Sequence, residues 1–359
     1  MPYLTDRFHD QNNSNQDNSN QNREAVPPRP PGAFDPDAVA DRLRARILGQ
    51  DPAVEAVVRA LTLAGAGIAD PARPLANLLL VGPTGTGKTE LVRQVAAELR
   101  AGPEDLCRVD MGALAQEHYA ASFSGAPPGY AGSKEAYSVF ERSKVEGDAY
   151  TPGVVLFDEV EKAHPTVLRA LLQVLDNGEL RLANGQERIS FRNSYVFLTS
   201  NLGSAELARR RRARWRRVAD RLGDRPGALT RRLAARGNET AVSAALRGFF
   251  DAEFLNRIDE TIVFTEFDTE TAKRIAVVEI EELRRRLRRR SVELEVDESV
   301  SELIAETGFD PVYGARGLRR CLRTTLAEPV AGAILRRRPT GREPITVRAR
   351  ATGGVVSTD

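Results

Sequence analysis

The segment GPTGTGKT, residues 82–89, constrains the fold of this chain more than any other stretch. It follows ANLLLV, an apolar run that predicts a buried strand, and it precedes TELVRQVAAELR, which predicts a helix. A glycine loop at such a junction directs backbone N–H groups and the positive end of the helix toward a phosphate. The junction could be purely structural, but the complete pattern between a strand and a helix predicts a nucleotide site.

Two side chains of this loop have specific predicted roles. Lys88 would contact the β- and γ-phosphates, and the hydroxyl of Thr89 would bind Mg²⁺. The whole predicted cradle comprises Gly82, Pro83, Thr84, Gly85, Thr86, Gly87, Lys88 and Thr89. The sequence therefore predicts ATP and Mg²⁺ as cofactors.

Polar residues that end two further apolar runs complete a candidate catalytic set. VVLFDE ends in Asp158 and Glu159, and SYVFLTSN ends in Asn201. The carboxyl ends of parallel strands meet at the ligand-binding edge of a sheet. We expect Asp158 to hold Mg²⁺, Glu159 to polarise the attacking water and Asn201 to orient water or the γ-phosphate. Alone, each could simply cap a strand or begin a turn.

The order of these runs predicts the fold class. Strands alternate with helices, which indicates an α/β fold whose parallel sheet is sandwiched by helices. After about residue 266, a long amphipathic helix, SVELEV, two more helices and PITVRAR predict a smaller α+β domain. The expected organisation is a disordered polar and proline-rich tail over 1–33, a large domain over 34–265, a small domain over 266–350 and a flexible tail over 351–359.

Composition excludes several other classes of protein. Cys107 and Cys321 are too few for a disulfide scaffold and lack the spacing of a zinc site. No apolar run reaches the roughly 20 residues of a membrane span, and the polar N-terminus does not resemble a secretory signal. The net charge of +2 on 359 residues indicates no particular partner. We expect a cytoplasmic protein.

Several blocks together resemble one family. They are ILGQDPAVEAV, GPTGTGKTEL, GAPPGYAG, VLFDEVEKAHP, LLQVLDNGEL, FRNSYVFLTSNLGS, EFLNRIDE and GFDPVYGARGL, and they span about residues 40 to 340. In this order they resemble the Clp family of AAA+ ATPases, most closely the second ATPase ring of ClpB-type chaperones. The resemblance implies a P-loop AAA+ fold with a Clp-type C-terminal domain.

The resemblance also implies roles for residues that the spacing alone does not identify. Arg257 matches the arginine finger, which reaches the γ-phosphate bound by a neighbouring subunit, and Arg316 matches the small-domain arginine called sensor 2. Adenine would lie near Ile47 and Leu48, with Ala315 close by. These three apolar residues could equally belong to the core.

Tyr130 lies between glycines in GAPPGYAG. In the family, an aromatic residue there lines the central pore and grips an extended polypeptide. A ring can contact almost any side chain, so such a grip needs no particular sequence. The alternative is a tyrosine that folds back onto its own subunit.

The chain departs from the family at several places. The 359 residues contain no counterpart of the N-terminal substrate domain, the first ATPase ring or the coiled-coil middle domain, so we expect substrates to be selected by the disordered tail or by an adaptor. No Ile-Gly-Leu or Ile-Gly-Phe tripeptide supports docking to the ClpP peptidase. The segment 206–237 is longer and more basic than its counterpart, and it could bind nucleic acid, an anionic membrane or an acidic partner. Trp215 within it could stack on bases. A solvated helical face would explain the same arginines.

Three functions are compatible with these sequence features. The first is an ATP-hydrolysing unfoldase that assembles as a ring, implied to be hexameric, and threads unfolded or aggregated proteins. The second is a nucleic-acid-associated AAA+ ATPase that uses the arginines of 206–237. The third is a nucleotide-switched scaffold with little turnover. The presence of Glu159, Asn201, Arg257 and Arg316 disfavours the scaffold, and Tyr130 with the Clp blocks disfavours the nucleic-acid motor.

Overall fold

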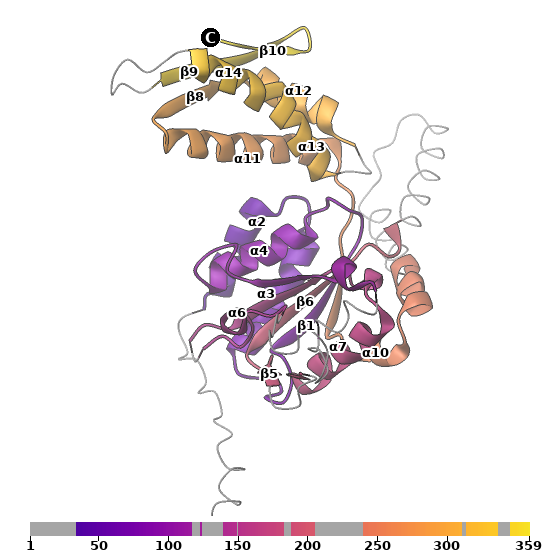
Figure 1. The fold of residues 1–359 in the computed structure, drawn as a ribbon. Helices are drawn as coiled ribbons and strands as arrows, with labels where there is room; N and C mark the ends of the chain where they lie inside the picture. Colours follow the sequence, from indigo (N-terminus) through magenta and orange to yellow (C-terminus); the bar gives the residue numbers. More distant parts are fainter. Residues whose placement is uncertain are drawn as a thin grey trace, which may run out of the picture.

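The computed structural model describes residues 34–116, 123, 139–148, 150–182, 188–204, 240–310, 314–336 and 345–359. A larger unit is built around one sheet, and a smaller unit that contains the C-terminus lies above it in Figure 1. The predicted α/β architecture with a smaller C-terminal α+β unit is confirmed.

The larger unit contains a sheet of five parallel strands. In chain order these are β1 (Ala76–Val81), β2 (Cys107–Asp110), β3 (Gly153–Asp158), β6 (Ser194–Ser200) and β7 (Glu260–Val263). Their order across the sheet is β2-β3-β6-β1-β7. Every residue of β1, β3 and β6 is buried, as expected for central strands covered on both faces.

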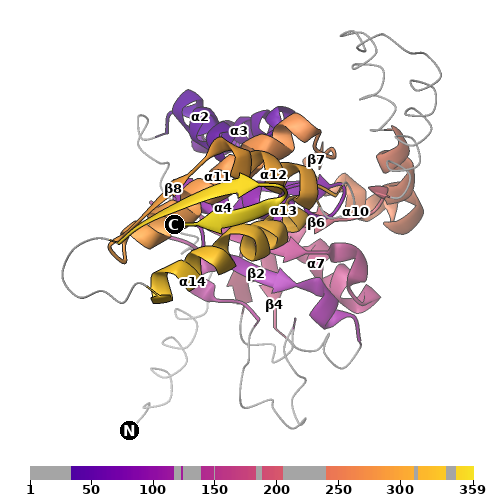
Figure 2. The same cartoon turned by 90° about the horizontal axis from the view of Figure 1, so that it is seen from above.

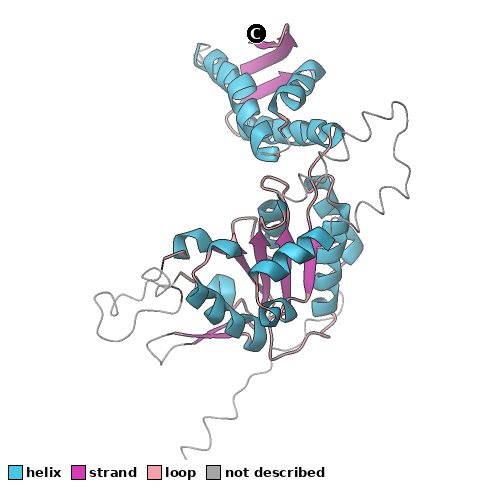
Figure 3. Ribbon diagram, turned by 90° about the vertical axis from the view of Figure 1, so that its right-hand side faces the viewer, coloured by secondary structure: helices cyan, strands magenta, loops and turns pink. Residues whose placement is uncertain are grey.

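Alternate residues of these strands enter two separate hydrophobic clusters. Leu78, Leu80 and Phe197 pack with α2 (Pro36–Arg46), α3 (Asp51–Gly65) and α4 (Lys88–Leu99) on one face. The opposite face packs against α7 (Pro165–Asn177) and α10 (Ala252–Asn256). Helices consequently flank the strands on both sides, as Figure 3 shows.

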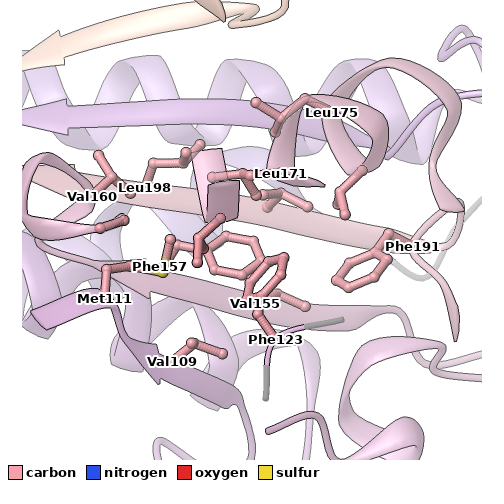
Figure 4. Packing of buried hydrophobic residues seen from close by; sticks show 14 of the residues in the cluster. Val109, Met111, Phe123, Val155, Phe157, Val160, Leu171, Leu175, Phe191 and Leu198 are labelled. Atoms are coloured by element: carbon pink, nitrogen blue, oxygen red, sulfur yellow. The ribbon is translucent and has the colours of Figure 1, made fainter. Parts of the chain in front are cut away.

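Aromatic rings fill much of the second face. Phe140 makes edge-to-face contacts with Phe123 and Phe191, with ring centroids 5.2 and 5.6 Å apart. Phe157 of β3 lies among them, close to Leu171 of α7 (Figure 4). These contacts fix α7 against the sheet.

Short elements connect the main ones. They are the 3₁₀ turns η1 (Met111–Leu114) and η2 (Val160–Lys162), helix α6 (Arg142–Val145), and the hairpin of β4 (Glu179–Arg181) with β5 (Arg188–Ser190). Residues 240–249 are also helical.

The smaller unit has a hydrophobic cluster of its own. Its helices are α11 (Thr269–Arg288), α12 (Glu298–Gly308), α13 (Ala315–Leu322) and α14 (Glu328–Arg336), with the π-helical turn η3 (Arg323–Ala327) between the last two. They pack against a sheet ordered β10-β9-β8, formed by β8 (Val292–Val296), β9 (Ile345–Thr352) and β10 (Val355–Thr358). Seen from above, this unit covers part of the larger one (Figure 2).

The expectation of a flexible tail over 351–359 is wrong. Gly353 and Gly354 have φ angles of 60° and 80°, the left-handed values that a two-residue hairpin turn requires. The turn pairs β10 antiparallel to β9, and Val356 enters the small-unit core at 7% exposure. The chain therefore ends as a strand of the small sheet.

Candidate functional site

The glycine loop between β1 and α4 places Lys88 in the interior. Its ammonium donates to the carbonyls of Gly82 and Pro83, at 2.5 and 2.9 Å, and to Oδ1 of Asn201 at 3.0 Å. Burial lowers the pKa of Lys88 to about 8, although Glu161 and Asp158 act in the opposite direction. Among the described residues, the hydrogen-bond partners of Lys88 are all neutral oxygens, so a phosphate would be a stronger partner for this buried cation.

The two acids that end β3 differ in their surroundings. Asp158 is 8% exposed, and it accepts hydrogen bonds from the Thr199 hydroxyl at 2.5 Å and from the Arg108 guanidinium at 2.6 Å. Glu159 adopts a left-handed backbone, with φ 60° and ψ 53°, and its N–H donates to the same Thr199 hydroxyl at 2.9 Å. This backbone conformation is unusual for a non-glycine residue and turns the Glu159 side chain out of the strand direction.

Asn201 connects the glycine loop to Glu159. Its Oδ1 accepts from Lys88 and from the Thr84 hydroxyl at 3.4 Å, and its Nδ2 donates to Oε1 of Glu159 at 3.2 Å. The backbone N–H of Asn201 donates to Glu161 at 3.0 Å. One amide therefore contacts both the predicted phosphate-binding and the predicted water-activating groups.

A single cleft of about 470 Å³ joins these groups. The predicted site residues that line it are Ile47, Leu48, Thr84, Gly85, Thr86, Gly87, Lys88, Thr89, Asp158, Glu159, Asn201, Ala315 and Arg316. We call it the nucleotide cleft. Gly82 and Pro83 contribute through their carbonyls beneath it, where they accept from Lys88.

Both units form the walls of the nucleotide cleft. Leu48 belongs to the larger unit but is buried in the small-unit cluster, whereas Ala315 and Arg316 begin α13. The N–H of Ala315 donates to the carbonyl of Gly85 at 3.0 Å, so the small unit contacts the glycine loop through its backbone. Movement of one unit relative to the other would change the shape of this cleft.

Arg257 lies elsewhere. It is the C-terminal cap of α10, just before β7 begins, and it does not line the nucleotide cleft. Its guanidinium forms an ion pair with Asp176 at 2.9 Å and is more than one-third exposed. The structure thus separates Arg257 from the other predicted site residues.

Two predicted features fall outside the described residues. Tyr130 lies in the segment 124–138, and the arginine-rich segment 206–237 lies within 205–239. The pore-loop and nucleic-acid hypotheses for these segments are therefore still predictions.

Several residues of the site were missed by reasoning from the sequence. Arg108, on the short strand β2, and Thr199, on β6, both contact Asp158, and Lys162 forms an ion pair with Glu159. Arg319 of α13 binds Glu279 at 2.6 Å and approaches Glu90 of α4 at 3.7 Å. Helical spacing could have indicated Lys162 and Arg319, since they follow Glu159 and Arg316 by three residues.

Comparisons with known proteins agree with this geometry. Residues 73–261 match the family "AAA domain (Cdc48 subfamily)", and residues 267–347 match the "C-terminal, D2-small domain, of ClpB protein". Over 354 residues the chain is 61% identical to an "ATP-dependent protease ATP-binding subunit-like protein" of Rhodococcus erythropolis, covering 98% of this chain and 97% of the relative.

More distant relatives extend the pattern. The chain is 42% identical to the chaperone protein ClpB of Vibrio cholerae, across 82% of this chain and 32% of that protein. A cryo-EM reconstruction of Hsp104 with ATPγS and FITC casein in the closed state superposes with a TM-score of 0.71 and 28% identity, covering 90% of this chain and 51% of that one. Among the described residues, no helix has the length and apolar character needed to span a membrane.

Proposed function

This chain belongs to the AAA family, as a Cdc48-subfamily AAA domain followed by a ClpB-type small domain, and we propose that it uses ATP hydrolysis to unfold polypeptides. It is an ATP-hydrolysing protein remodeller of the ClpB type. The observation that carries the mechanism is the convergence of Lys88, Glu159 and Asn201 with Arg316 of the small unit on one cleft. ATP bound there would contact both units at once.

ATP would enter with its phosphates on the glycine loop. Lys88 would exchange its carbonyl partners for the β- and γ-phosphates, which favour the charged ammonium. Ile47, Leu48 and Ala315 line the cleft beside α11 and offer apolar surface for the base. These roles are inferred from position in the cleft together with the family pattern.

The residues in the cleft fit Mg²⁺. Thr89 and Asp158 both face it with oxygen donors, the ligand type that Mg²⁺ prefers, and Mg²⁺ in nucleotide sites usually has few protein ligands. We propose that they hold the ion beside the phosphates, where it would neutralise part of their charge. In the structure Asp158 forms an ion pair with Arg108 at 2.6 Å. Binding of Mg²⁺ by Asp158 would therefore require this ion pair to break.

Glu159 is the proposed general base. Its left-handed backbone and its bond from Asn201 fix the carboxylate at the mouth of the glycine loop, where water could approach the γ-phosphate. Asn201 would fix the position of this carboxylate relative to the Lys88 ammonium, because its amide is hydrogen-bonded to both side chains.

Arg257 would act on a neighbouring subunit. It precedes β7 and lies near the amino ends of the strands, whereas the nucleotide cleft lies at their carboxyl ends. The strand between these ends, β1, spans roughly 20 Å for six residues at about 3.3 Å each, too far for one arginine side chain to cross. We therefore propose a ring of identical subunits, in the family's hexameric form, in which each subunit supplies Arg257 to the next.

Polypeptide is the proposed substrate. The Hsp104 reconstruction that superposes on this chain was obtained with casein, and Tyr130 is the proposed contact in the pore. Arg316 and the backbone bond from Ala315 to Gly85 would convert changes at the phosphates into movement of the small unit. Neither the geometry of the described residues, which do not include 206–237, nor the relatives favour the nucleic-acid alternative. An adaptor, the lack of ClpP docking and a cytoplasmic location stay predictions.

A pair of assays tests the proposal. Unfolded casein should raise the rate of ATP turnover by the wild-type protein, and Tyr130→Ala should remove this stimulation while basal turnover persists. Tyr130→Phe is the matched control, because it keeps the ring and should retain stimulation. Stimulation by single-stranded DNA but not by casein would overturn the assignment.

A further inference from the structure

Asn77 is a polar residue where an apolar one is expected. It occupies the second position of β1, ANLLLV, and is fully buried at 0% exposure. Its Oδ1 has no hydrogen-bond partner among the described residues, so the amide is retained at a cost in desolvation. The contacts of the amide nitrogen are what offset this cost.

The amide nitrogen of Asn77 joins two distant carbonyls. It donates to the carbonyl of Leu175, in the last turn of α7, at 3.0 Å and to the carbonyl of Arg257 at 3.1 Å. Arg73 donates to the same two oxygens, at 3.4 Å through Nε and at 3.1 Å through Nη2. Asn77 in β1 and Arg73 just before it thus bind the same pair of backbone carbonyls, and we call these four hydrogen bonds the clamp.

Asp259 ties this clamp to the sheet. Its carboxylate accepts from the backbone N–H of Asn77 at 2.7 Å and from Arg73 at 3.2 Å, and its own N–H donates to the carbonyl of Asn77 at 2.9 Å. Asp259 is only two residues beyond Arg257. The peptide that carries Arg257 is therefore held to β1 on both sides.

The clamp also fixes the partner of the Arg257 side chain. Asp176, which pairs with the Arg257 guanidinium, directly follows Leu175, one of the two clamped residues. The exposed ion pair by itself contributes little to holding position. The hydrogen bonds of Asn77, together with those of Arg73, connect the end of α7 directly to the backbone of Arg257.

We infer that Asn77, assisted by Arg73, is a positioning residue for Arg257, holding its backbone so that the guanidinium is presented to the nucleotide of the neighbouring subunit. The inference rests on the proposed role of Arg257. A catalytic group displaced by about 1 Å can lose about 100-fold in rate, so a backbone anchor matters even though it never touches substrate.

The first test measures steady-state ATP turnover by Asn77→Leu, which keeps the approximate volume but removes the donor. We expect kcat to fall by about 10- to 100-fold and the KM for ATP to change less than about twofold, because the variant's own cleft is intact. If Asn77→Leu fails to fold, Arg73→Gln provides the test instead. Because Arg73 is partly exposed and only assists Asn77, this variant should lower kcat by a smaller factor.

Two variants serve as matched controls. Ser194→Ala removes another fully buried donor at the start of a central strand, a hydroxyl that bonds the Val145 carbonyl at 2.5 Å with no link to Arg257. Arg59→Gln breaks a nearby surface pair with Glu260. Both should leave kcat within about twofold of wild type, since neither holds Arg257.

Mixed assemblies separate positioning from general damage. In a mixture of Asn77→Leu with Glu159→Gln, the first subunit has an intact cleft and the second presents an intact Arg257. Turnover should recover severalfold over either variant alone, whereas a mixture of Asn77→Leu with Arg257→Ala should show no such recovery, because neither subunit presents a correctly held Arg257.

The outcomes distinguish the inference from its premise. If Arg257→Ala mixed with Glu159→Gln shows no recovery, Arg257 does not act in trans and the proposed function fails. If that mixture recovers but Asn77→Leu has wild-type kcat, or is inactive without recovering in the mixture, the positioning role of Asn77 is refuted.

Discussion

The two ends of the central sheet hold polar groups in different ways. At the carboxyl ends, Lys88, Asp158 and Asn201 surround an open cleft, and their hydrogen bonds can be exchanged for those of a ligand. At the amino ends, Asn77 and Asp259 bond to backbone and to each other. The groups at the first end are free to exchange partners with a ligand, whereas those at the second end hold the backbone of Arg257. Under the proposed function, one subunit would contribute to two nucleotide sites, with different chemistry at each.

Removing the side chain of Arg257 should have the largest effect on turnover. Arg257→Ala should lower kcat by about 10³-fold or more, because an arginine finger stabilises charge in the transition state. Nucleotide affinity of the isolated subunit, measured by fluorescence of a labelled ATP analogue, should be unchanged. Arg257→Lys is the matched control and should recover only part of the rate. Loss of affinity in the isolated subunit would show that the two ends are not independent.

Removing the proposed base tests the opposite end. Glu159→Gln should lower kcat by about 10² to 10⁴-fold, because the amide cannot accept the proton of the attacking water. ATP should still bind, so single-turnover assays and filter binding separate the two effects. Glu161→Gln removes a neighbouring carboxylate and should have a much weaker effect on the chemical step. Equal turnover by Glu159→Gln and wild type would remove Glu159 from the mechanism.

Proton uptake on ATP binding reports on Lys88 at the carboxyl end of the sheet. Burial lowers the pKa of Lys88 from 10.5 to about 8, so between these values the unfolded chain binds more protons and stability rises with pH. Phosphates should raise the pKa of Lys88 again, so ATP binding at about pH 9 should be accompanied by the uptake of close to one proton. The affinity for ATP should then fall by up to about tenfold for each further pH unit. Calorimetry in buffers of different ionisation enthalpy measures the uptake.

Lys88→Arg provides the control for that measurement. Its guanidinium stays charged throughout, so any uptake that remains must come from another group. Uptake that is equal in the two proteins would contradict the assignment to Lys88.

The smallest expected effect lies outside the sheet. Asp268 is the N-terminal cap of α11, and its carboxylate accepts a hydrogen bond from the Thr271 N–H at 2.8 Å. Hydrogen bonds from the Thr271 hydroxyl and from this N–H lower the pKa of Asp268 below 3.8. Asp268→Ala should cost about 1 kcal/mol at neutral pH. The difference should shrink as the pH falls below 3.8 through the folded-state pKa, when the wild-type carboxyl also becomes neutral. Thermal unfolding at several pH values measures it, and a larger difference in acid would contradict the sign.

The sequence predicted the carboxyl end well for a physical reason. GPTGTGKT is contiguous, and VVLFDE and SYVFLTSN each carry a strand and its terminal polar residues together, so the parallel arrangement brings them to one place. Strands β2 and β7 were not predicted, because each has four residues and neither is a continuous buried run. Arg108 was missed along with β2.

The amino end could not be predicted in the same way. Asn77 contacts Asp259 across 182 positions, and Arg73 contacts Leu175 across 102, so only the strand order brings these groups together. The local sequence ANLLLV does not show whether its asparagine has a role or is simply a polar residue in an otherwise apolar strand. The role of Arg257 itself came from the family resemblance, and the structure adds the anchor that holds it.

The backbone bond between Ala315 and Gly85 restricts which changes the protein can accept. Gly314 precedes it with φ 52°, and a Cβ added there would lie 2.6 Å from the Gly85 carbonyl oxygen. Even one methyl group at residue 314 would therefore clash with the glycine loop and push the small unit away from it. Because the atoms that such a Cβ would meet belong to the main chain of Gly85, repacking of side chains would not relieve the clash, and we expect residue 314 to accept glycine far better than any larger residue.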